Sequence, residues 1–321
     1  MDFTPADLSH IQELTHCGIT RAAVAIGVFD GVHRGHQKLL TELLSVASEL
    51  NADPVVMTFF PHPRSILSKN PPNLLYPPEE KIRLLHDYGI KAVVTVNFTR
   101  QFSQLTPDQF LKQSVFAGTV PVPAVCVGKH WRFGAGAAGN AEYLERVAAE
   151  KHFRFRAVDE LCMEDGQVVS STAIREAVSA GRLDRAEQML GRRYTLSGTI
   201  ISGYQNAREK LHTPTANLQI EYGILPPCGV YAARAYLSER EHFAAAVNIG
   251  VSPTFQEEYG EIPPRVEIHL LDGFQGDLYG RKMQLELAGF IRKEIRFPDI
   301  PSLKKQIGCD IEKIKHILGR S

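Results

Sequence analysis

A chain of 321 residues that is 44% hydrophobic and 22% charged has the length of one large or two ordinary domains and the composition of a globular protein. Its 36 lysines and arginines balance 36 aspartates and glutamates, so no global field favours nucleic acid or an anionic membrane. Any phosphate binding must therefore depend on local basic groups. Five scattered cysteines without a CxxC pair argue against a zinc site or a disulfide framework and favour a reducing compartment.

The amino-terminal residues, MDFTPADLSHIQEL, carry early acids and lack the basic-then-apolar pattern of a secretory signal. No segment approaches the ~20 consecutive apolar residues that span a bilayer. We therefore expect a soluble, cytoplasmic protein that binds neither nucleic acid nor membrane. The sequence leaves weak self-association open.

Short β-branched runs alternate with amphipathic helical stretches from the start of the chain to about Arg182. This alternation predicts an α/β fold, a doubly wound parallel sheet with helices on both faces. The expected strands lie at 22–29, 54–60, 91–98 and 123–128, and the expected helices at 36–50, 77–89, 106–116 and 140–151.

The rhythm changes in the second part of the chain. Strand-like runs at 194–202, 229–237, 242–250, 264–271 and 282–290 are separated by glycine and proline turns, with no helix among them. This pattern predicts a mostly antiparallel β-barrel domain closed by a carboxy-terminal helix. We expect two domains, 1–184 and 185–321. The apolar stripe of the final helix comprises Leu303, Ile307, Ile311, Ile314 and Leu318.

The stretch GVFDGVHRGH joins the first buried strand to the first long helix. Doubly wound sheets bind ligands at the carboxyl ends of strands, beside helix amino termini whose amides favour an anion. His33 and His36 can both aim at one phosphate group there. HxGH is the arrangement of nucleotidyltransferases, in which imidazoles stabilise charge on the α-phosphate, although alone it also fits an ordinary turn. The glycines that leave room for close backbone approach are Gly27, Gly31 and Gly35.

A second motif, SSTAIREAVSAG, opens the last helix of this first part. Ser171 and Thr172 offer hydroxyls at its start, and Arg175 lies on its first turn. The hydroxyls could cap the helix and do nothing more, but beside Arg175 they also suit the pyrophosphate end of ATP. The two motifs together are far more specific than either one alone.

The chain resembles the bacterial bifunctional riboflavin kinase and FAD synthetase family, whose amino-terminal module is an FMN adenylyltransferase of the nucleotidyltransferase superfamily. The resemblance is nearly chain-long. In this first part it rests on four stretches in the family's order and approximate spacing: GVFDGVHRGHQKLL, MTFFPHPRSIL, VGKHWRFGAGAAGN and SSTAIREAVSAG.

The resemblance implies that the phosphate of FMN attacks the α-phosphorus of ATP and that pyrophosphate leaves without a covalent intermediate. The protein then contributes positioning and electrostatic stabilisation. His33 and His36 would contact the ATP phosphates, and Ser171, Thr172 and Arg175 would hold the leaving group. The other loop residues implied in ATP or phosphate binding, with Asp30 shaping the loop, are Gly27, Phe29, Asp30, Gly31 and Gly35.

Flavin binding is expected at three further positions. FPHPR supplies His62 and Arg64 after a strand end, near the flavin phosphate, although a proline-locked turn with surface charges fits the same residues. The family usually has asparagine or aspartate at the position of His130, in the nucleotide or flavin pocket, and often has glutamate at that of Phe60. Because histidine can also donate or accept a hydrogen bond, we expect altered affinity rather than loss.

HTPTANLQI, residues 212–220, resembles the PTAN motif of riboflavin kinases. Thr215 and Asn217 carry the small oxygen donors that Mg²⁺ and a phosphate chain require. We expect Mg²⁺ as the cofactor there, ATP as co-substrate at both sites, and riboflavin, FMN and FAD as flavin substrates and products. Alone, the tetrapeptide also fits a turn that enters a strand.

Polar and aliphatic residues alternate at the start of RVEIHLLDGFQGDLYG, which places Glu267 and His269 on the face of a strand opposite its aliphatic side chains. Glu267 matches the family's general base, which takes the proton from the ribityl 5′-hydroxyl as that oxygen attacks the γ-phosphate. The simpler alternative is a solvent-facing carboxylate. FIRKEIRF places Arg292 ahead of the final helix, where the family binds flavin and nucleotide.

The largest departure from the family precedes PTAN, where GRxLGF is usual and this chain has REKLHT. Arg208 and His212 replace both glycines, Glu209 stands where arginine is usual, and Thr213 replaces phenylalanine. Glycines there let backbone amides wrap the nucleotide phosphates, and side chains can block that approach. The carboxylate of Glu209 also repels a triphosphate.

Three functions therefore compete. The leading hypothesis is a two-step enzyme that converts riboflavin to FMN and FMN to FAD at two separate sites. The second is a monofunctional FMN adenylyltransferase with a degenerate kinase domain. The third is a flavin-binding regulatory protein without turnover, against which the presence of His33, His36 and Glu267 argues.

Overall fold

The structure, a computed structural model, describes residues 6–201, 215–238, 241–250, 264–271, 274 and 278–319. The chain forms two compact units. The first comprises Met1–Pro72 and Pro78–Ser170, and the second comprises Asn73–Pro77 and Ser171–Ser321.

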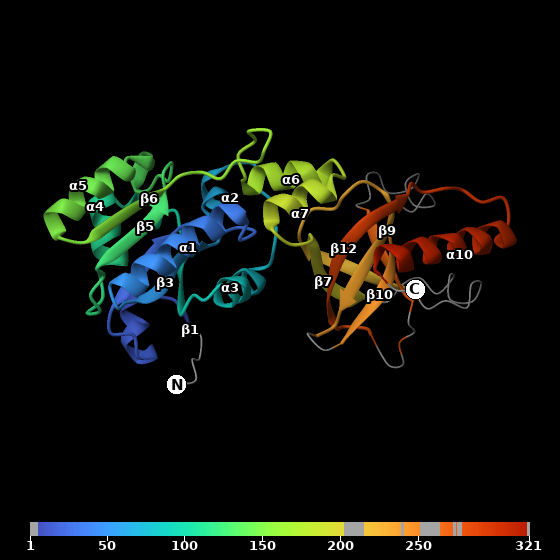
Figure 1. Cartoon of the computed structure of the whole chain (residues 1–321), viewed down its shortest axis with the longest axis horizontal. Coiled ribbons are helices and arrows are strands. Elements are labelled where there is room, and N and C mark those ends of the chain that lie inside the picture. The colour runs from blue at the N-terminus through green and yellow to red at the C-terminus, as the bar shows by residue number, and fades with distance from the viewer. Residues whose placement is uncertain are drawn as a thin grey trace. The chain divides into compact units, whose positions relative to one another are not determined.

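The first unit is built on a six-stranded parallel sheet with the strand order β1-β4-β3-β2-β5-β6 (Figure 1). The central β2 pairs with β3 on one side and β5 on the other, so the winding direction reverses there, as it does in doubly wound sheets. The predicted sheet is confirmed. Its strands are β1 (Ala6–Leu8), β2 (Ala22–Ile26), β3 (Asp53–Phe60), β4 (Ala92–Asn97), β5 (Ala124–Gly128) and β6 (Arg154–Val158).

Successive residues of β2 point to opposite faces of the sheet and enter two different cores. Ala23 and Ala25 pack in the cluster that includes the apolar stripe of α1. Val24 and Ile26 pack in the second cluster, which includes buried residues of α5. Both faces are therefore covered, which explains why the strand reads as an uninterrupted apolar run. The helices of this unit are α1 (Arg34–Glu49), α2 (Pro63–Leu67), α3 (Pro78–Asp87), α4 (Pro107–Phe110) and α5 (Ala141–Lys151).

Local signals fix where these helices begin. Asn140 caps α5 by accepting a hydrogen bond from the backbone N–H of Tyr143 at 2.8 Å. Thr106 and Gln109 form a reciprocal capping box at α4. The predicted helix at 106–116 is divided, because α4 passes into a π-helical turn over Leu111–Val115. Short 3₁₀ turns cover Ile11–Cys17, Phe102–Gln104 and Ala135–Ala137.

The second unit contains a closed barrel with the strand order β10-β11-β8-β7-β12-β9, in which all neighbours are antiparallel. Closure leaves no sheet edge, and it confirms the predicted antiparallel barrel. Its strands are β7 (Thr195–Ile201), β8 (Thr215–Tyr222), β9 (Gly229–Tyr236), β10 (His242–Gly250), β11 (Arg265–Leu270) and β12 (Lys282–Arg292).

Within the described residues of the second unit, three helices accompany the barrel: α6 (Ser171–Ser179), α7 (Leu183–Leu190) and α10 (Ile300–Ile317). Asp299 caps α10 by accepting from the backbone N–H of Ser302 at 2.7 Å. The apolar stripe of α10 serves two purposes. Ile314 and Leu318 pack on Ala232 and Ala244 of the barrel, whereas its amino-terminal half, Leu303, Ile307 and Ile311, lines a cavity.

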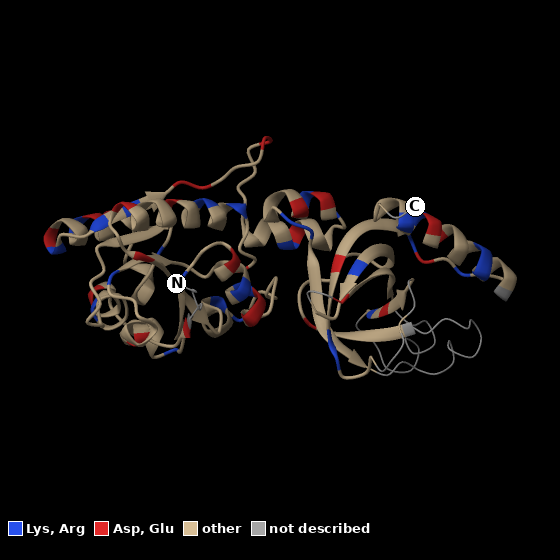
Figure 2. Ribbon diagram, turned by 60° about the horizontal axis from the view of Figure 1, so that its bottom comes forward, with Lys and Arg blue, Asp and Glu red and all other residues tan. Residues whose placement is uncertain are grey.

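Acidic and basic side chains are interspersed along both units, as the neutral overall charge predicts (Figure 2). None of the helices in the described part of the chain has the length and hydropathy to span a bilayer.

Candidate active sites

The loops that follow three adjacent strands of the parallel sheet carry most of the site residues predicted in the first unit. The loop after β2 leads to His33, the loop after β3 carries His62, and the turn after β5 carries His130. Because β2 lies between β3 and β5, these three loops meet at the carboxyl edge of the sheet, beside the point where the winding reverses. This is the edge at which doubly wound folds bind ligands.

The loop after β2 has an unusual backbone. Phe29, Gly31 and Val32 all have left-handed φ angles, of 54°, 82° and 37°. Only glycine adopts such angles without strain, so surrounding structure must hold the other two. Both side chains are fully buried, and the backbone N–H of Val32 donates to the carbonyl of Phe29 at 3.1 Å. The loop therefore has a fixed shape before any ligand arrives.

The two predicted histidines lie against each other at the start of α1. His33 is the N-cap, and its Nδ1 accepts a hydrogen bond from the backbone N–H of His36 at 3.3 Å. Since Nδ1 accepts, the ring proton of the neutral His33 imidazole is on Nε2. The two rings stack with centroids 3.6 Å apart and planes 17° from parallel. Both imidazoles thus lie at the positive end of the dipole of a helix.

Gly35 is required by close packing. A Cβ at this position would lie 3.1 Å from the His33 ring and 3.3 Å from the carbonyl oxygen of Val169. The segment that ends at Ser170 therefore runs beside the histidine loop, within the first unit. The chain continues directly into α6 with the predicted Ser171.

His62, Arg64 and His130 lie where the chain leaves two of the strands. His62 caps the short helix α2, with its Nδ1 accepting from the backbone N–H of Arg64 at 3.0 Å. Arg64 and His130 are exposed. Their side chains are therefore accessible to a ligand from solvent.

A buried lysine beneath the histidine loop was not among the predicted site residues. Lys81 of α3 is 8% exposed, and its Nζ donates to Thr58 Oγ1 at 3.0 Å and to the carbonyl of Val28 at 3.4 Å. Burial lowers the pKa of Lys81 from 10.5 to about 8, and the nearby charge of Asp30 acts in the opposite direction. The sequence does contain a signal that Lys81 lies on the buried face of its helix, because it precedes the buried Leu85 by one helical turn.

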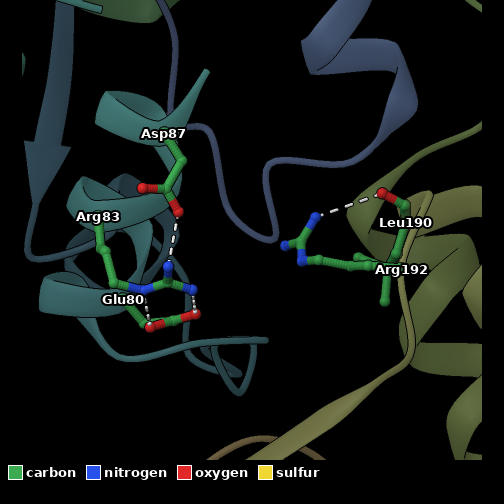
Figure 3. A network of polar contacts seen from close by, with 5 residues as sticks. All are labelled: Glu80, Arg83, Asp87, Leu190 and Arg192. Carbon is green, nitrogen blue, oxygen red and sulfur yellow. Dashed lines mark hydrogen bonds and ion pairs between the residues drawn. The ribbon is translucent and has the colours of Figure 1, made fainter. Parts of the chain in front are cut away.

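The neighbouring charges on α3 form a separate group. Arg83 donates to the buried Glu80 at 2.7 Å and to the exposed Asp87 at 2.6 Å (Figure 3). In the second unit, Arg192 donates to the carbonyl of Leu190 at 3.3 Å (Figure 3).

The second predicted motif opens α6 in the second unit. Ser171 is the first residue of the helix and Thr172, which follows it, is exposed. The Nε of Arg175 donates to the carbonyl of Asn73 at 2.7 Å, and Arg175 lies one helical turn after the two hydroxyl residues. The structure thus brings these three residues together at one helix amino terminus, as the motif predicts.

The second unit contains a cavity of about 290 Å³ between the barrel and the amino-terminal half of α10. Glu267 and Arg292, predicted from separate motifs, both line it. The cavity is mostly apolar, with a few convergent polar groups, which is the usual character of a small-molecule site. The other lining residues are Val230, Ala246, Val247, Asn248, Ile268, His269, Glu294, Ile295, Phe297, Leu303, Ile307, Asp310 and Ile311.

A polar row crosses three neighbouring strands at this cavity. Glu267 on β11 pairs directly with Asn217 on β8 and with Asn248 on β10. Residues directly opposite in an antiparallel sheet point to the same face. Two residues away on the same pair of strands, the backbone of Thr215 on β8 pairs with that of His269 on β11. The PTAN motif and the predicted general base are therefore brought together by strand register.

Two acidic residues that line the cavity, Glu294 and Asp310, were not predicted as site residues. Asp310 on α10 is buried and holds Arg292, with Nε and Oδ2 2.8 Å apart. Its other carboxylate oxygen accepts from Gln306 at 2.8 Å. Glu294 accepts from the amide of Asn248 at 3.4 Å, and its carboxylate lies over Gly250. Asp310 could have been suspected, because it is a charge one turn before Ile314 on an apolar stripe.

The residues present fit a magnesium ion by their chemistry. Asn217, which pairs with Glu267 across adjacent strands, supplies a side-chain amide oxygen, and Mg²⁺ is commonly held by one or two protein oxygens together with substrate phosphates. No group of three or more His, Cys, Asp or Glu side chains suited to a metal occurs in the described ranges. Arg208, Glu209, His212 and Thr213, which replace the family's glycine-rich stretch, lie outside the described residues.

Comparisons with known proteins agree with this division into two sites. The family model described as FAD synthetase matches residues 18–173, and that described as riboflavin kinase matches residues 190–318. A Haemophilus influenzae protein named bifunctional riboflavin kinase/FMN adenylyltransferase is 36% identical over 296 residues, which cover 91% of this chain and 93% of that protein. A protein of the same name from Escherichia coli (strain K12) is 34% identical over 310 residues, 96% of each chain.

One solved structure matches across both units. A crystal structure described as a macrolide-efflux protein from Streptococcus pneumoniae superposes with a TM-score of 0.81 and 25% sequence identity, covering 97% of this chain and 98% of that one. The fold is thus shared over nearly the whole length.

Proposed function

The chain belongs to the family of bifunctional riboflavin kinases/FMN adenylyltransferases, and we propose that it performs the two reactions at two separate sites. One site, at the carboxyl edge of the parallel sheet, transfers AMP from ATP to FMN and releases pyrophosphate. The other, in the barrel cavity, transfers the γ-phosphoryl group of ATP to riboflavin. The observation that carries the proposal is that each unit presents its own polar constellation, His33 with His36 in one and Glu267 with Arg292 in the other.

In adenylyl transfer, negative charge develops on the α-phosphate as the FMN phosphate attacks. The amino terminus of α1 supplies backbone amides, and His33 Nε2–H supplies a donor whose direction the Nδ1 contact fixes. His36 lies over the same ring and is held by it. From the sequence motif alone, Ser171, Thr172 and Arg175 are proposed to bind the pyrophosphate that leaves.

Flavin contacts in this reaction are proposed for the residues after β3 and β5. His62, Arg64 and His130 follow strands on either side of the histidine loop, at the edge to which the phosphate of FMN must come. The exposed guanidinium of Arg64 suits a phosphate. His130, where the family usually has asparagine or aspartate, offers one ring nitrogen as donor or acceptor.

In the kinase reaction, Glu267 is proposed as the general base that accepts the proton of the ribityl 5′-hydroxyl. Its position on β11 directs it into the cavity, beside Asn217 and Asn248. Arg292 reaches the same cavity from the end of β12 and provides the positive charge. The apolar wall contributed by α10 suits the flavin ring, because apolar surface buries best against apolar surface.

Magnesium is proposed at the barrel site, held by Asn217 and Thr215 of the PTAN motif. When bound, it would neutralise phosphate charge during transfer. We also propose a cytoplasmic location, since five cysteines without a disulfide suit a reducing compartment. Weak self-association stays a prediction, which sedimentation at several concentrations tests.

The test is product chromatography after the purified protein has been incubated with Mg·ATP and either riboflavin or FMN. FAD formed from both substrates supports both activities. FAD formed from FMN alone would mean that REKLHT has silenced the kinase, and no FAD from either would support a binding protein. We propose 1–184 as the transferase domain, and FAD synthesis from FMN by a chain truncated after Asp184 would support that boundary.

A further inference from the structure

A buried ammonium group lies directly beneath the histidine loop. The side chain of Lys81 comes from α3 and is 8% exposed. Its Nζ donates to the hydroxyl of Thr58 at 3.0 Å and to the carbonyl of Val28 at 3.4 Å. The Thr58 hydroxyl itself donates to the same carbonyl at 2.9 Å. Lys81 therefore joins the carboxyl ends of β2 and β3 at the place where the loop leaves the sheet.

The loop contains a buried carboxylate that this ammonium balances. Asp30 is 5% exposed, and its charge favours the protonated form of Lys81. Opposite charges in a buried setting favour each other's charged form, so the carboxylate of Asp30 offsets part of the cost of burying Lys81. Asp30 follows Phe29, whose left-handed backbone also has to be held in place.

Burial of a charged lysine costs desolvation free energy, and packing alone does not require a charged side chain at this position. Desolvation lowers the pKa of Lys81 to about 8, and a methionine of similar length would pack there without that penalty. Lysines of this unit that serve only as ion-pair partners are more exposed: Lys129 pairs with Asp159 at the surface. An expensive buried charge that contacts a loop in a left-handed conformation points to a role in that loop's shape.

We infer that Lys81 is a positioning residue for adenylyl transfer: it fixes the loop after β2, through Val28, Thr58 and Asp30, so that His33 and His36 are aimed at the α-phosphate. The inference rests on the proposed transfer reaction at this loop. Lys81 does not touch the substrates. Its contribution is to the geometry in which they react.

A role in positioning makes a specific kinetic prediction. Loss of the ammonium lets the loop shift while leaving the pockets for ATP and FMN largely in place, so turnover should fall more than binding. A misplacement of about 1 Å by a residue away from the chemistry can cost about 100-fold in rate. We expect kcat for FAD synthesis from FMN to fall about 100-fold in Lys81→Met, with KM for both substrates nearly unchanged.

The matched control is Lys91→Met. Lys91 pairs with Asp53 at 2.7 Å, at the opposite, amino-terminal end of the same strand β3. The Lys91→Met substitution removes a lysine and an ion pair from the same sheet without changing any contact of the histidine loop. Both variants are compared for thermal unfolding, for FAD synthesis from FMN and for riboflavin phosphorylation, the last of which reports on the second unit of the same molecule.

The smaller change Thr58→Val removes one hydroxyl from the same group without changing charge. It should lower kcat for FAD synthesis by about tenfold, the equivalent of one hydrogen bond. If Lys81→Met does not fold, Thr58→Val decides alone: a fall in kcat at constant KM supports the inference and an unchanged kcat overturns it.

The inference is overturned if Lys81→Met synthesises FAD as fast as the wild type, or if Lys91→Met loses the same activity at the same loss of stability. Either result leaves the proposed function intact. Failure of the proposed function looks different, because the wild-type protein itself would then make no FAD from FMN.

Discussion

The imidazole of His33 accepts a hydrogen bond from the backbone N–H of His36. The same imidazole also stacks on the ring of His36, with centroids 3.6 Å apart. The first histidine of HxGH thus caps the helix on which the second one lies. The spacing of three residues is what places an N-cap side chain over the first turn. His33 therefore sets the direction of His36 as well as its own, and the pair acts as one unit.

Replacing His36 by alanine should cripple FAD synthesis from FMN while sparing riboflavin phosphorylation. Loss of one preorganised group at a developing charge costs about 100- to 1,000-fold in turnover. Steady-state kinetics with FMN and with riboflavin measure the two effects in one protein. His16→Ala, an exposed histidine of the same unit, is the control and should leave both rates unchanged. Equal loss of both reactions in His36→Ala would contradict separate sites.

The titration of Lys81 predicts how FAD synthesis depends on pH. Asp30 is the charged group that acts on it, Glu80 and Arg83 on its own helix pair with each other, and β3 contributes the uncharged Thr58. Since the pKa of Lys81 is about 8, its ammonium loses its proton in mildly alkaline solution, and the positive charge beneath the histidine loop is lost. We expect kcat for FAD synthesis to fall above pH ~8 in the wild type. A profile for Lys81→Met with the same fall would contradict this assignment.

The lowered pKa of Lys81 makes the free energy of unfolding change with pH in the direction opposite to kcat. The folded pKa of about 8 lies below the ordinary value of 10.5, so between these values the unfolded chain binds more protons than the folded one. The free energy of unfolding of the wild type should therefore rise with pH in that range, relative to Lys81→Met. Urea unfolding of both proteins at several pH values measures the difference.

Sequence patterns predicted the sheet, the barrel and the position of HxGH because each depends on local periodicity or on a short motif. The strand β6 was not predicted, because its sequence RFRAV carries charges. Such charges are tolerated at the edge of a sheet, where one side of the strand is unpaired. Lys81 and Asp310 were not predicted as site residues for a different reason. Each is a single charge on the buried stripe of an amphipathic helix, and only the fold shows which partners, Thr58 or Arg292, make that burial tolerable.

Register explains why the barrel site could be predicted only in part. PTAN and Glu267 were assigned from separate motifs, and their pairing across β8 and β11 is a tertiary fact. Likewise, the apolar stripe of α10 gives no sign that Ile314 packs on the barrel while Ile307 lines the cavity.

Asp310→Asn should weaken riboflavin binding in the kinase reaction. The change keeps the shape of the side chain but removes the charge that holds Arg292 at 2.8 Å. A charge-assisted hydrogen bond contributes about 1.5–3 kcal/mol, so KM for riboflavin should rise about tenfold or more. Glu312→Gln is the control on the same helix, because its exposed pair with Lys315 contributes little. FAD synthesis from FMN should be unchanged in both variants, and an equal loss there would argue for misfolding.

Restoring the family's glycines at positions 208 and 212 should accelerate riboflavin phosphorylation. The side chains of Arg208 and His212 replace residues whose backbone amides can wrap phosphates. We expect kcat/KM for ATP in the kinase reaction to rise about tenfold, as for a gain of one good phosphate contact. An unchanged value would mean that REKLHT forms a working cradle of its own.

The central claim, two reactions at two sites, is tested most directly by Glu267→Gln with product chromatography. The substitution removes the proposed base while keeping size and hydrogen bonding, so the variant should make FAD from FMN at the wild-type rate and almost none from riboflavin, the kinase step falling by about 100- to 10,000-fold. Wild-type conversion of riboflavin by the variant, or parallel loss of FAD synthesis from FMN, would contradict the claim.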